Sequence, residues 1–358
     1  MNAFLWVSSW LEGFGLEQVE SIWILAPLGL IFIFLFIIVP SSMIVAYLDR
    51  KVTADFQARV GPNRAGPAGV FQSWADFFKL LQKDRNSEVS WSEELWLAIH
   101  TMALYSTVAV LPLGSLMLLV DTDMSVFLPF WAALVVALGT MLLGLSQKTV
   151  AGWYGGIRVA TQAISGAFPA LVAMICVGLR AGSFRWSGLV AIQGAAPLSW
   201  TAFSNPFQFI ALIVFLVSGL VLLAIPPMDA ALSSPDVSGG VAAHLSGRRL
   251  VLFKMGRFYS FYLWAVIASV LFLGGWKLPF EISENLLEQG KIQLLHFLEL
   301  CCLMTKSLIL ILLVIWGARV NPRTRVDQIT DFAWTVLSPF ALFALIGASL
   351  VAGWGVLS

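Results

Sequence analysis

The sequence predicts an all-α, polytopic membrane protein with about eight transmembrane helices and one further amphipathic helix at the membrane surface. The first observation is compositional. Of the 358 residues, 59% are hydrophobic and only 11% are charged, whereas soluble domains carry about 25% charged residues. The second is that apolar runs of about 20 residues, the length that crosses a bilayer, recur along the chain. The third is that basic residues concentrate in alternate loops between these runs.

Apolar runs account for most of the chain, which we expect to fold as a single transmembrane bundle over residues 23–355. The N-terminal segment, residues 1–22, contains three Glu and no Lys or Arg. It therefore lacks the basic region of a cleaved secretory signal. The expected spans are residues 23–47, 95–120, 127–146, 159–179, 207–226, 259–276, 294–317 and 334–355.

The distribution of basic residues predicts the orientation of the bundle. The loops after spans one, three, five and seven hold 16 Lys and Arg, the other three loops hold four, and the N-terminal segment holds none. Cytoplasmic loops carry such an excess of positive charge. We therefore expect a bacterial cytoplasmic membrane protein with both termini away from the cytoplasm. The main cytoplasmic loops would be residues 49–94, 227–258 and 318–333.

Residues 69–83, in the first of these loops, are predicted to form the amphipathic interfacial helix. Apolar residues recur every three or four positions, and polar residues such as Asp76 and Lys79 fall on the opposite side. At about 15 residues the segment is too short to cross a bilayer, and Gly-Pro pairs at 61–62 and 66–67 predict turns before it. The apolar face comprises Val70, Phe71, Trp74, Phe77, Phe78 and Leu81.

Several cations precede this helix and would lie beside its apolar face. They are Arg50, Lys51, Arg59 and Arg64. A helix of this kind often does no more than anchor a loop in the membrane surface. An apolar slot with cations at its mouth would also suit an amphipathic ligand with a polar head and a lipid tail.

Nothing in the sequence indicates a metal or cluster site, or a nucleic-acid partner. Cys176, Cys301 and Cys302 all lie in apolar runs without the spacing of metal ligands, and the three His are scattered. A net charge of +1 gives no basic surface for nucleic acid. We expect these cysteines to be core residues.

The cytoplasmic loops carry distinctive motifs. They are YLDRKVTADFQARVGPNRAGPAGVFQSWADFFKLLQKD at 47–84, GGIRVATQAIS at 155–165, PPMDAALSSPDVSGGVAAHLSGRRLVLF at 226–253 and PRTRVDQ at 322–328. In this order they resemble the loops of the H-subunit family of respiratory complex I, the NADH:quinone oxidoreductase, whose mitochondrial member is called subunit 1. The resemblance extends over about residues 45–355, and eight spans is the usual count in that family.

The resemblance implies a non-redox membrane-arm subunit with quinone as substrate and no catalytic centre, metal or cluster of its own. Its spans and loops would form most of the quinone tunnel and the junction with the peripheral arm. Its partners would be other membrane-arm subunits, the peripheral iron–sulfur and hydrogenase-derived quinone-site subunits, and lipid. The predicted tunnel and docking residues, which combine family positions with Trp74 from the apolar face of the helix at 69–83, are Asp49, Arg50, Arg59, Arg64, Trp74, Asp76, Arg158, Asp229 and Asp236.

Carboxylates are the main departure from the family pattern. The family's Ser-Tyr-Glu in the fourth span is Ser-Gly-Ala at 165–167, and its Pro-Glu-x-Glu-x-Glu at 231–236 keeps only Asp236. Other family acids are replaced by Gly239, His244 and Arg257. By the resemblance, these acids form a hydrated path that couples quinone reduction to proton movement. Since their replacements cannot carry protons as buried carboxylates do, we expect fewer protons translocated per electron.

Two other functions are kept as alternatives. The loss of acids is also compatible with the equivalent subunit of a complex I-related membrane-bound hydrogenase that uses a different electron donor. The second alternative, a stand-alone secondary transporter, would need inverted repeats and ionisable residues near the midplane. No internal repeat is visible in the sequence.

Within the seventh span, Glu299 and Lys306 are seven residues apart and so lie on one helix face. Ionisable residues inside a span are functional candidates, so both are candidates for a proton path. The alternative is that they pair with each other or lie near the interface. For the quinone itself, we expect entry between the first span, the helix at 69–83 and the sixth span, toward Arg50, Arg64 and Asp229.

Overall fold

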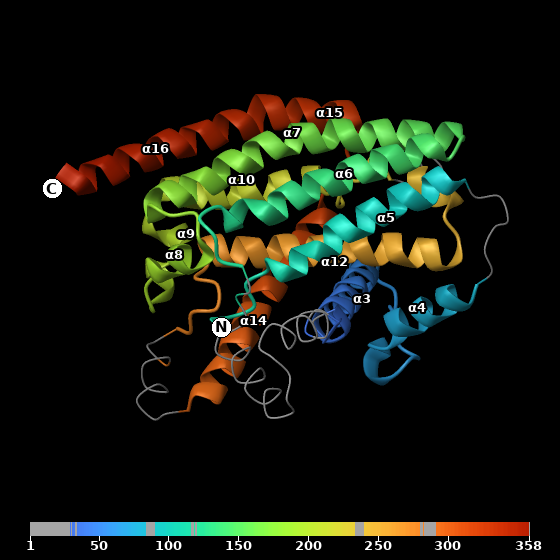
Figure 1. Ribbon diagram of the computed structural model, residues 1–358, viewed down its shortest axis with the longest axis horizontal. Helices are drawn as coiled ribbons and strands as arrows, with labels where there is room; N and C mark the ends of the chain where they lie inside the picture. Colours follow the sequence, from blue (N-terminus) through green and yellow to red (C-terminus); the bar gives the residue numbers. More distant parts are fainter. Residues whose placement is uncertain are drawn as a thin grey trace, which may run out of the picture.

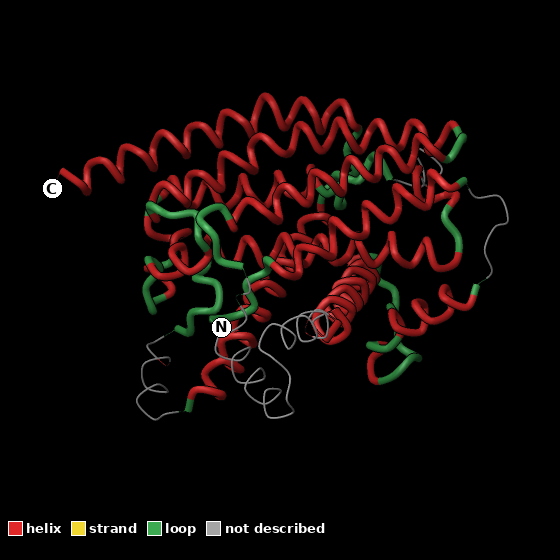
Figure 2. Tube along the Cα trace, in the orientation of Figure 1, coloured by secondary structure: helices red, strands yellow, loops and turns green. Residues whose placement is uncertain are grey.

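A computed structural model shows that the described part of the chain consists of helices and connecting loops, without strands (Figure 2). It describes residues 34–83, 90–115, 120–232, 240–279 and 291–357, together with positions 29, 31, 32, 118 and 282. The all-α prediction is confirmed within these ranges. Asp236, one of the predicted tunnel residues, lies outside them. The helices are α3 (Val39–Phe56), α4 (Gln72–Gln82), α5 (Trp91–Ser106), α6 (Leu128–Ser146), α7 (Val150–Ala181), α8 (Trp186–Ala191), α9 (Thr201–Ser204), α10 (Pro206–Leu222), α12 (Gly247–Phe272), α14 (Ile292–Val320), α15 (Val326–Phe332) and α16 (Ser338–Leu357).

The bundle is organised around two long helices. α7 packs against α6, α10 and α16, and α12 packs against α3, α5 and α14. In Figure 1, α5, α6, α7, α10, α12 and α16 run roughly alongside one another, and α3 and α14 cross them steeply. α12 is the most enclosed of the membrane-spanning candidates, with 89% of its apolar window buried. It therefore forms the centre against which the short helix α4 also packs.

Five helical stretches are long and apolar enough to cross a membrane on their own. They are Ser125–Ser146, Val150–Ala181, Gly247–Phe272, Ile292–Val320 and Val326–Ala352. The remaining predicted spans correspond to shorter helices, α3, α5 and α10. α3 is preceded by a π-helical turn over Phe34–Ile38, and the predicted span before that turn lies largely outside the described residues. A polytopic membrane protein is therefore confirmed.

The second predicted span, 95–120, is wrong in its last third. α5 ends at Ser106 and a 3₁₀ turn over Thr107–Ala109 follows, after which the described chain is not helical. Pro112 explains the end, because proline disfavours helical geometry in the residue before it and has no N–H to donate. The residues after it approach α14 instead.

Several helices extend further into the expected loops than the hydropathy pattern indicated. α3 continues to Phe56, so Asp49 and Arg50 lie on a helix. α7 begins at Val150, where the Thr149 hydroxyl accepts a hydrogen bond from the Gly152 N–H, so Arg158 also lies on a helix. α12 begins at Gly247. Helix length is thus set by capping and packing as well as by the thickness of the apolar layer.

Candidate functional site

A compact turn positions α4 beside the end of α3. Residues 61–71 fold back on themselves, with the Phe71 N–H bonded to the Ala65 carbonyl at 3.0 Å. Gly69 has a φ of +80°, and a Cβ there would lie only 2.2 Å from the Pro62 carbonyl oxygen, so the turn requires glycine. The Tyr47 hydroxyl on α3 donates to the Ala68 carbonyl at 3.0 Å, which ties the turn to α3. For these reasons α4 begins at Gln72, later than the predicted position 69.

Some apolar residues of α4 pack against the helix bundle, and the others are exposed on its surface. Trp74, Phe77 and Leu80 are partly buried against a small core of α3 and α12 residues, which comprises Val39, Met43, Val251 and Met255. By contrast, Phe71, Phe78 and Leu81 are exposed, as expected for residues that meet lipid. The sequence predicted one apolar face, whereas the structure has two: one packs on α3 and α12, and the other is exposed. Trp74, a predicted site residue, stabilises the seating of α4 on the bundle.

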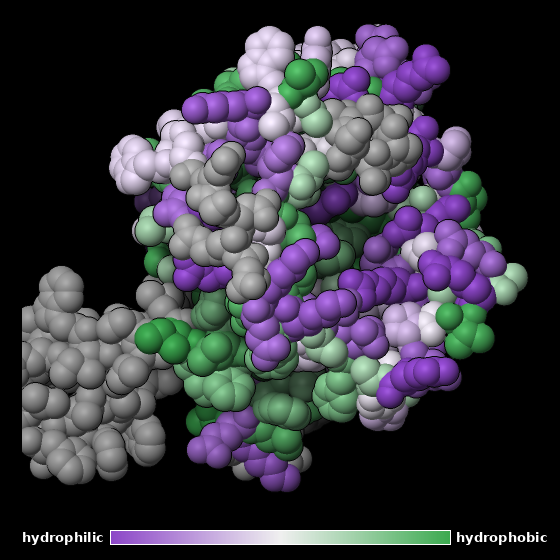
Figure 3. Space-filling model, turned by 90° about the vertical axis from the view of Figure 1, so that its right-hand side faces the viewer, coloured by the Kyte–Doolittle hydropathy of each residue, from purple (hydrophilic) through white to green (hydrophobic). Residues whose placement is uncertain are grey.

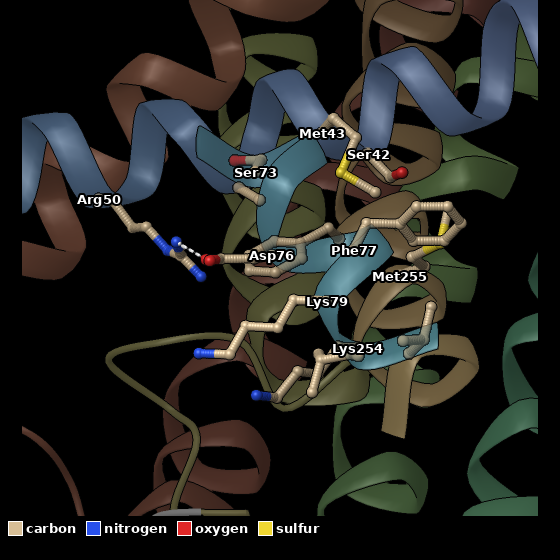
Figure 4. A pocket seen from close by; sticks show the side chains of 13 residues that line it. Ser42, Met43, Arg50, Ser73, Asp76, Phe77, Lys79, Lys254 and Met255 are labelled. Atoms are coloured by element: carbon tan, nitrogen blue, oxygen red, sulfur yellow. Dashed lines mark hydrogen bonds and ion pairs between the residues drawn. The ribbon is translucent and has the colours of Figure 1, made fainter. Parts of the chain in front are cut away.

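A cavity of about 230 Å³, here called the mouth cavity, lies between α3, α4 and α12. Arg50 of α3 forms an ion pair with Asp76 of α4 across it (Figure 4). Figure 4 shows Lys79 and Lys254 with their ammonium groups pointing to the same side, and Met43, Phe77 and Met255 on another side. The cavity is therefore apolar along one wall and cationic along the other.

Ser73 adds a free hydrogen-bonding group to the mouth cavity. Its hydroxyl is buried and has no hydrogen-bond partner among the described residues, yet the residue lines the cavity. Buried hydroxyls are normally paired. The Ser73 hydroxyl is therefore an unpaired buried group in the wall of the mouth cavity, one helical turn before Asp76.

A second cavity, of about 220 Å³ and here called the arginine cavity, lies between α3, α12, α14 and the segment after α10. Asp229 is almost fully buried there, and one of its oxygens has no hydrogen bond from the described residues. Arg257 of α12 and Arg323 each approach Asp229 at 3.7 Å, and Arg319 of α14 pairs with Asp49 of α3. Three guanidinium groups and two carboxylates therefore face one cavity, which leaves an excess of positive charge.

The two cavities are neighbours. Phe258 of α12 lines both, while the consecutive residues Asp49 and Arg50 of α3 face the arginine cavity and the mouth cavity respectively. The linings of the two cavities therefore meet at Phe258 and at these two adjoining residues of α3.

The mouth cavity opens near a polar end of the molecule. Figure 3 shows hydrophilic residues gathered over the end formed by α4 and by the neighbouring ends of α5, α6, α7 and α12. In addition to the lysines of the mouth cavity, this end carries Arg249, which is buried in ion pairs with Glu93 at 3.7 Å and Glu94 at 2.7 Å. The structure thus concentrates charge at the end that the sequence predicts to be cytoplasmic.

Some predicted site residues lie outside both cavities. Arg59 and Arg64 are exposed in the turn after α3, where the Arg59 Nε donates to Gln57 at 2.7 Å. Arg158 is half-buried on α7. None of the three lines the mouth cavity or the arginine cavity. The expected path toward Arg64 is therefore not part of either cavity, whereas Arg50 and Asp229 each line one.

Glu299 and Lys306 lie near α8 and the α12 C-terminus, on the part of α14 away from the arginine cavity, and they do not pair with each other. Glu299 accepts hydrogen bonds from the Ser115 N–H at 3.2 Å and from the Ser115 hydroxyl, and lies 3.4 Å from His296 Nδ1. Lys306 donates to the carbonyls of Gly275 at 2.9 Å and Lys277 at 3.0 Å. Its ammonium also lies 4.2 Å from the centre of the Trp200 ring. Lys306 thus stabilises the turn after α12.

The sequence indicated some cavity residues only by their charge. Lys254, Arg319 and Arg323 were part of the positive-inside pattern but were not assigned to the site, and Arg257 stood out only as a replacement for a family acid. Arg319 lies in the last turn of α14 and Arg323 in the non-helical stretch after it, so no helical spacing in the sequence indicates their shared cavity. Among the described residues, no three His, Cys, Asp or Glu side chains gather as metal ligands would.

Comparison with known proteins supports the resemblance drawn from the loops. A family model described as NADH dehydrogenase matches residues 28–349. A curated relative, the NADH-quinone oxidoreductase H subunit of Anaeromyxobacter dehalogenans (strain 2CP-C), is 29% identical over 348 residues, which cover 94% of this chain and 84% of the relative. Among solved structures, a chain of the membrane-bound sulfane sulfur reductase (MBS), an archaeal respiratory membrane complex, superposes with a TM-score of 0.77 at 21% identity. The match covers 90% of this chain and 100% of that one.

Proposed function

The chain belongs to the NADH dehydrogenase family as a membrane-arm subunit of a complex I-type complex, and we propose that it forms the passage by which a membrane quinone reaches the redox partners. The observation that carries the proposal is the mouth cavity. It combines an apolar wall of Met43, Phe77 and Met255 with a cationic rim that includes Arg50, Lys79 and Lys254. Such a cavity suits a ligand with an apolar tail and a hydrogen-bond-accepting head.

In this proposal the site binds the quinone and lets it pass, and the redox reaction takes place with groups of other subunits. The chain contributes binding and orientation, and the electrons come from clusters in peripheral subunits seated over the polar end. In this arrangement Arg50 and the two lysines meet the quinone head first. The arginine cavity, beyond Phe258, is the next polar space available to it. The polar end faces the cytoplasm of a bacterium, and both termini lie on the other side of the membrane.

A substitution that fills the mouth cavity tests the proposal. Ala46 is buried on α3 and lines the cavity, so Ala46→Trp would fill roughly half of its space and force out a bulky ligand. We expect reduction of a long-tailed quinone by the assembled complex to fall at least about tenfold. Electron transfer from the donor to ferricyanide, which does not need the passage, should be unchanged.

Ala75→Trp is the matched control, because Ala75 lies on the exposed side of α4. This variant should reduce the long-tailed quinone at the rate of the unmodified complex. The proposal fails if Ala46→Trp and Ala75→Trp reduce quinone equally fast while both complexes are assembled.

A hydrogenase-type assembly is the second candidate. The replacement of family acids favours it, since these positions hold Gly239, His244 and Arg257. The donor decides between the two: the purified complex should oxidise NADH with quinone, and a complex that oxidises hydrogen but not NADH would establish the alternative. The family membership argues against the stand-alone transporter.

A further inference from the structure

A hydrogen-bonded cluster near the start of α14 brings together atoms of the kind that bind a transition-metal ion. Its members are His296 and Glu299, one turn apart on the helix, and Ser115 from the segment after α5. The Ser115 Oγ lies 3.1 Å from the His296 Nδ1 and 2.5 Å from the Glu299 Oε2. The His296 and Glu299 atoms are themselves 3.4 Å apart. Imidazole nitrogen and carboxylate oxygen are common ligands of Zn²⁺, so the cluster has two zinc-binding side chains with a hydroxyl beside them.

The spacing of these three atoms matches that of ligands around one zinc ion. Bonds from Zn²⁺ to nitrogen or oxygen are about 2.0–2.2 Å long. For the three separations found here, a point about 2.1 Å from every one of the atoms exists about 1 Å outside their plane. The separations are therefore compatible with a single ion bound to all three. The imidazole favours Zn²⁺ over Mg²⁺ or Ca²⁺, which prefer oxygen ligands.

The Glu299 carboxylate is fixed in orientation by the backbone. Glu299 is 8% exposed, and its Oε2 accepts a hydrogen bond from the Ser115 N–H at 3.2 Å. Carboxylates that bind a metal are commonly held by such a contact from outside the ligand set. The backbone of Ser115 thus positions the carboxylate, while its hydroxyl lies where a third ligand would be.

A cavity beside the cluster has room for the water that completes a four-coordinate shell. It has a volume of about 320 Å³ and is lined by Ser115 and Glu299, by residues of α8 and by residues of the turn after α12. This volume exceeds what several waters need. Ser115 is exposed and the His296 side chain is 26% exposed. An ion can therefore reach the cluster from outside the bundle.

We propose that His296, Glu299 and Ser115 form a zinc-binding site at the end of the bundle near α8. The bound ion ties the segment after α5 to α14. The site is weaker than a closed structural site with four protein ligands, and the positive charge of Lys277, which also lines the cavity, lowers its affinity further. The inference is independent of the quinone passage.

Zinc-dependent stability of this chain tests the site within the assembled complex. Cys176 is fully buried, so a maleimide labels its thiol only when the chain unfolds. Loosely bound metal is removed with a chelator, and the temperature of half-labelling is measured without metal, with Zn²⁺ and with Mg²⁺. At a Zn²⁺ concentration of about one hundred times Kd we expect a rise of roughly 5 °C. Mg²⁺ should give no rise.

His296→Ala removes the nitrogen ligand, so the Zn²⁺ concentration for a half-maximal rise should increase at least about tenfold. Glu299→Gln removes the charge but keeps an acceptor for the Ser115 hydrogen bonds, and the same increase is expected. His244→Ala is the matched control, because it removes an exposed imidazole from the segment before α12. It should respond to Zn²⁺ as the native complex does.

Counting of bound zinc after equilibrium dialysis gives a second readout. The His296→Ala complex should hold one ion fewer than the His244→Ala complex. The proposal is overturned if Zn²⁺ does not raise the labelling temperature of the native complex, or if Mg²⁺ raises it equally. It is also overturned if His296→Ala and His244→Ala bind zinc alike. His296 is partly exposed, so His296→Ala decides the matter even where Glu299→Gln does not assemble.

Discussion

Replacing Asp229 by Asn would leave two arginines without their shared carboxylate. The Asp229 side chain is 6% exposed, and Arg257 and Arg323, which lie 3.7 Å from it, are 30% and 50% exposed. A unit charge pair at this distance interacts by about 4 kcal/mol at an effective dielectric constant of about 20. Since Arg323 is half exposed, solvent screens its contribution, and Arg257 dominates.

The expected cost of Asp229→Asn follows from this geometry. Removing one partner of a fully buried ion pair costs about 3–5 kcal/mol, and the partial exposure of Arg257 reduces this to about 2–3 kcal/mol. The double variant with Arg257→Gln should recover most of that loss, because it leaves no uncompensated buried charge. The recovery of stability in the double variant is the stricter test, because it depends on the ion pair rather than on the loss of Asp229 alone.

Alkylation of Cys176 measures the effect within the assembled complex. Cys176 is fully buried in the bundle core, so its thiol reacts with a maleimide only when this chain unfolds. The temperature of half-labelling should fall by roughly 5 °C or more in Asp229→Asn and return toward the native value in the double variant. Asp331→Asn, on the exposed side of α15, is the control. Equal labelling temperatures for Asp229→Asn and Asp331→Asn would refute the reasoning.

Three further variants give contrasting expectations. Arg50→Gln breaks a pair with Asp76 in which the two side chains are 43% and 34% exposed. It should therefore cost less than about 1 kcal/mol in stability but raise the quinone KM several-fold; an unchanged KM would contradict its place in the mouth cavity. Lys306→Met removes two hydrogen bonds to carbonyls and should cost about 2–3 kcal/mol without changing the proton-to-electron ratio; a changed ratio would restore Lys306 as a proton-path residue. The Arg185 guanidinium holds the pKa of the exposed Asp123 below its ordinary value of 3.8. Any stability from this pair is therefore present above that pH and is lost as the pH falls through the lowered pKa in the folded state, so Asp123→Asn should affect the Cys176 labelling temperature at neutral pH but not at the acid end. An equal effect at both pH values would contradict the pairing.

Local patterns in the sequence predicted most of the helices and the apolar residues of α4, but not which of those residues pack on the bundle. Apolar periodicity identified Trp74 and Phe77, which pack on α3 and α12. Pro112 marks the end of the second span, although average hydropathy obscured it. These features depend on residues close together in the chain, and local propensity and burial decide them.

The composition of the cavities could not be predicted in the same way. Asp229 meets Arg323, and Asp49 meets Arg319, across long stretches of chain, and no periodicity connects them. The seven-residue spacing correctly placed Glu299 and Lys306 on one helix. It could not show that the Lys306 ammonium donates hydrogen bonds to carbonyls of the turn after α12, because that turn is distant from Lys306 in the sequence.

Covalent labelling by a photoreactive quinone tests the central claim most directly. The assembled complex is illuminated with a long-tailed quinone analogue, with and without excess unlabelled quinone, and the labelled peptides of this chain are identified. The quinone passage predicts displaceable labelling on the walls of the mouth cavity, at Met43, Phe77 or Met255. Displaceable labelling confined to the far end of the bundle, around α8 and α9, would contradict it.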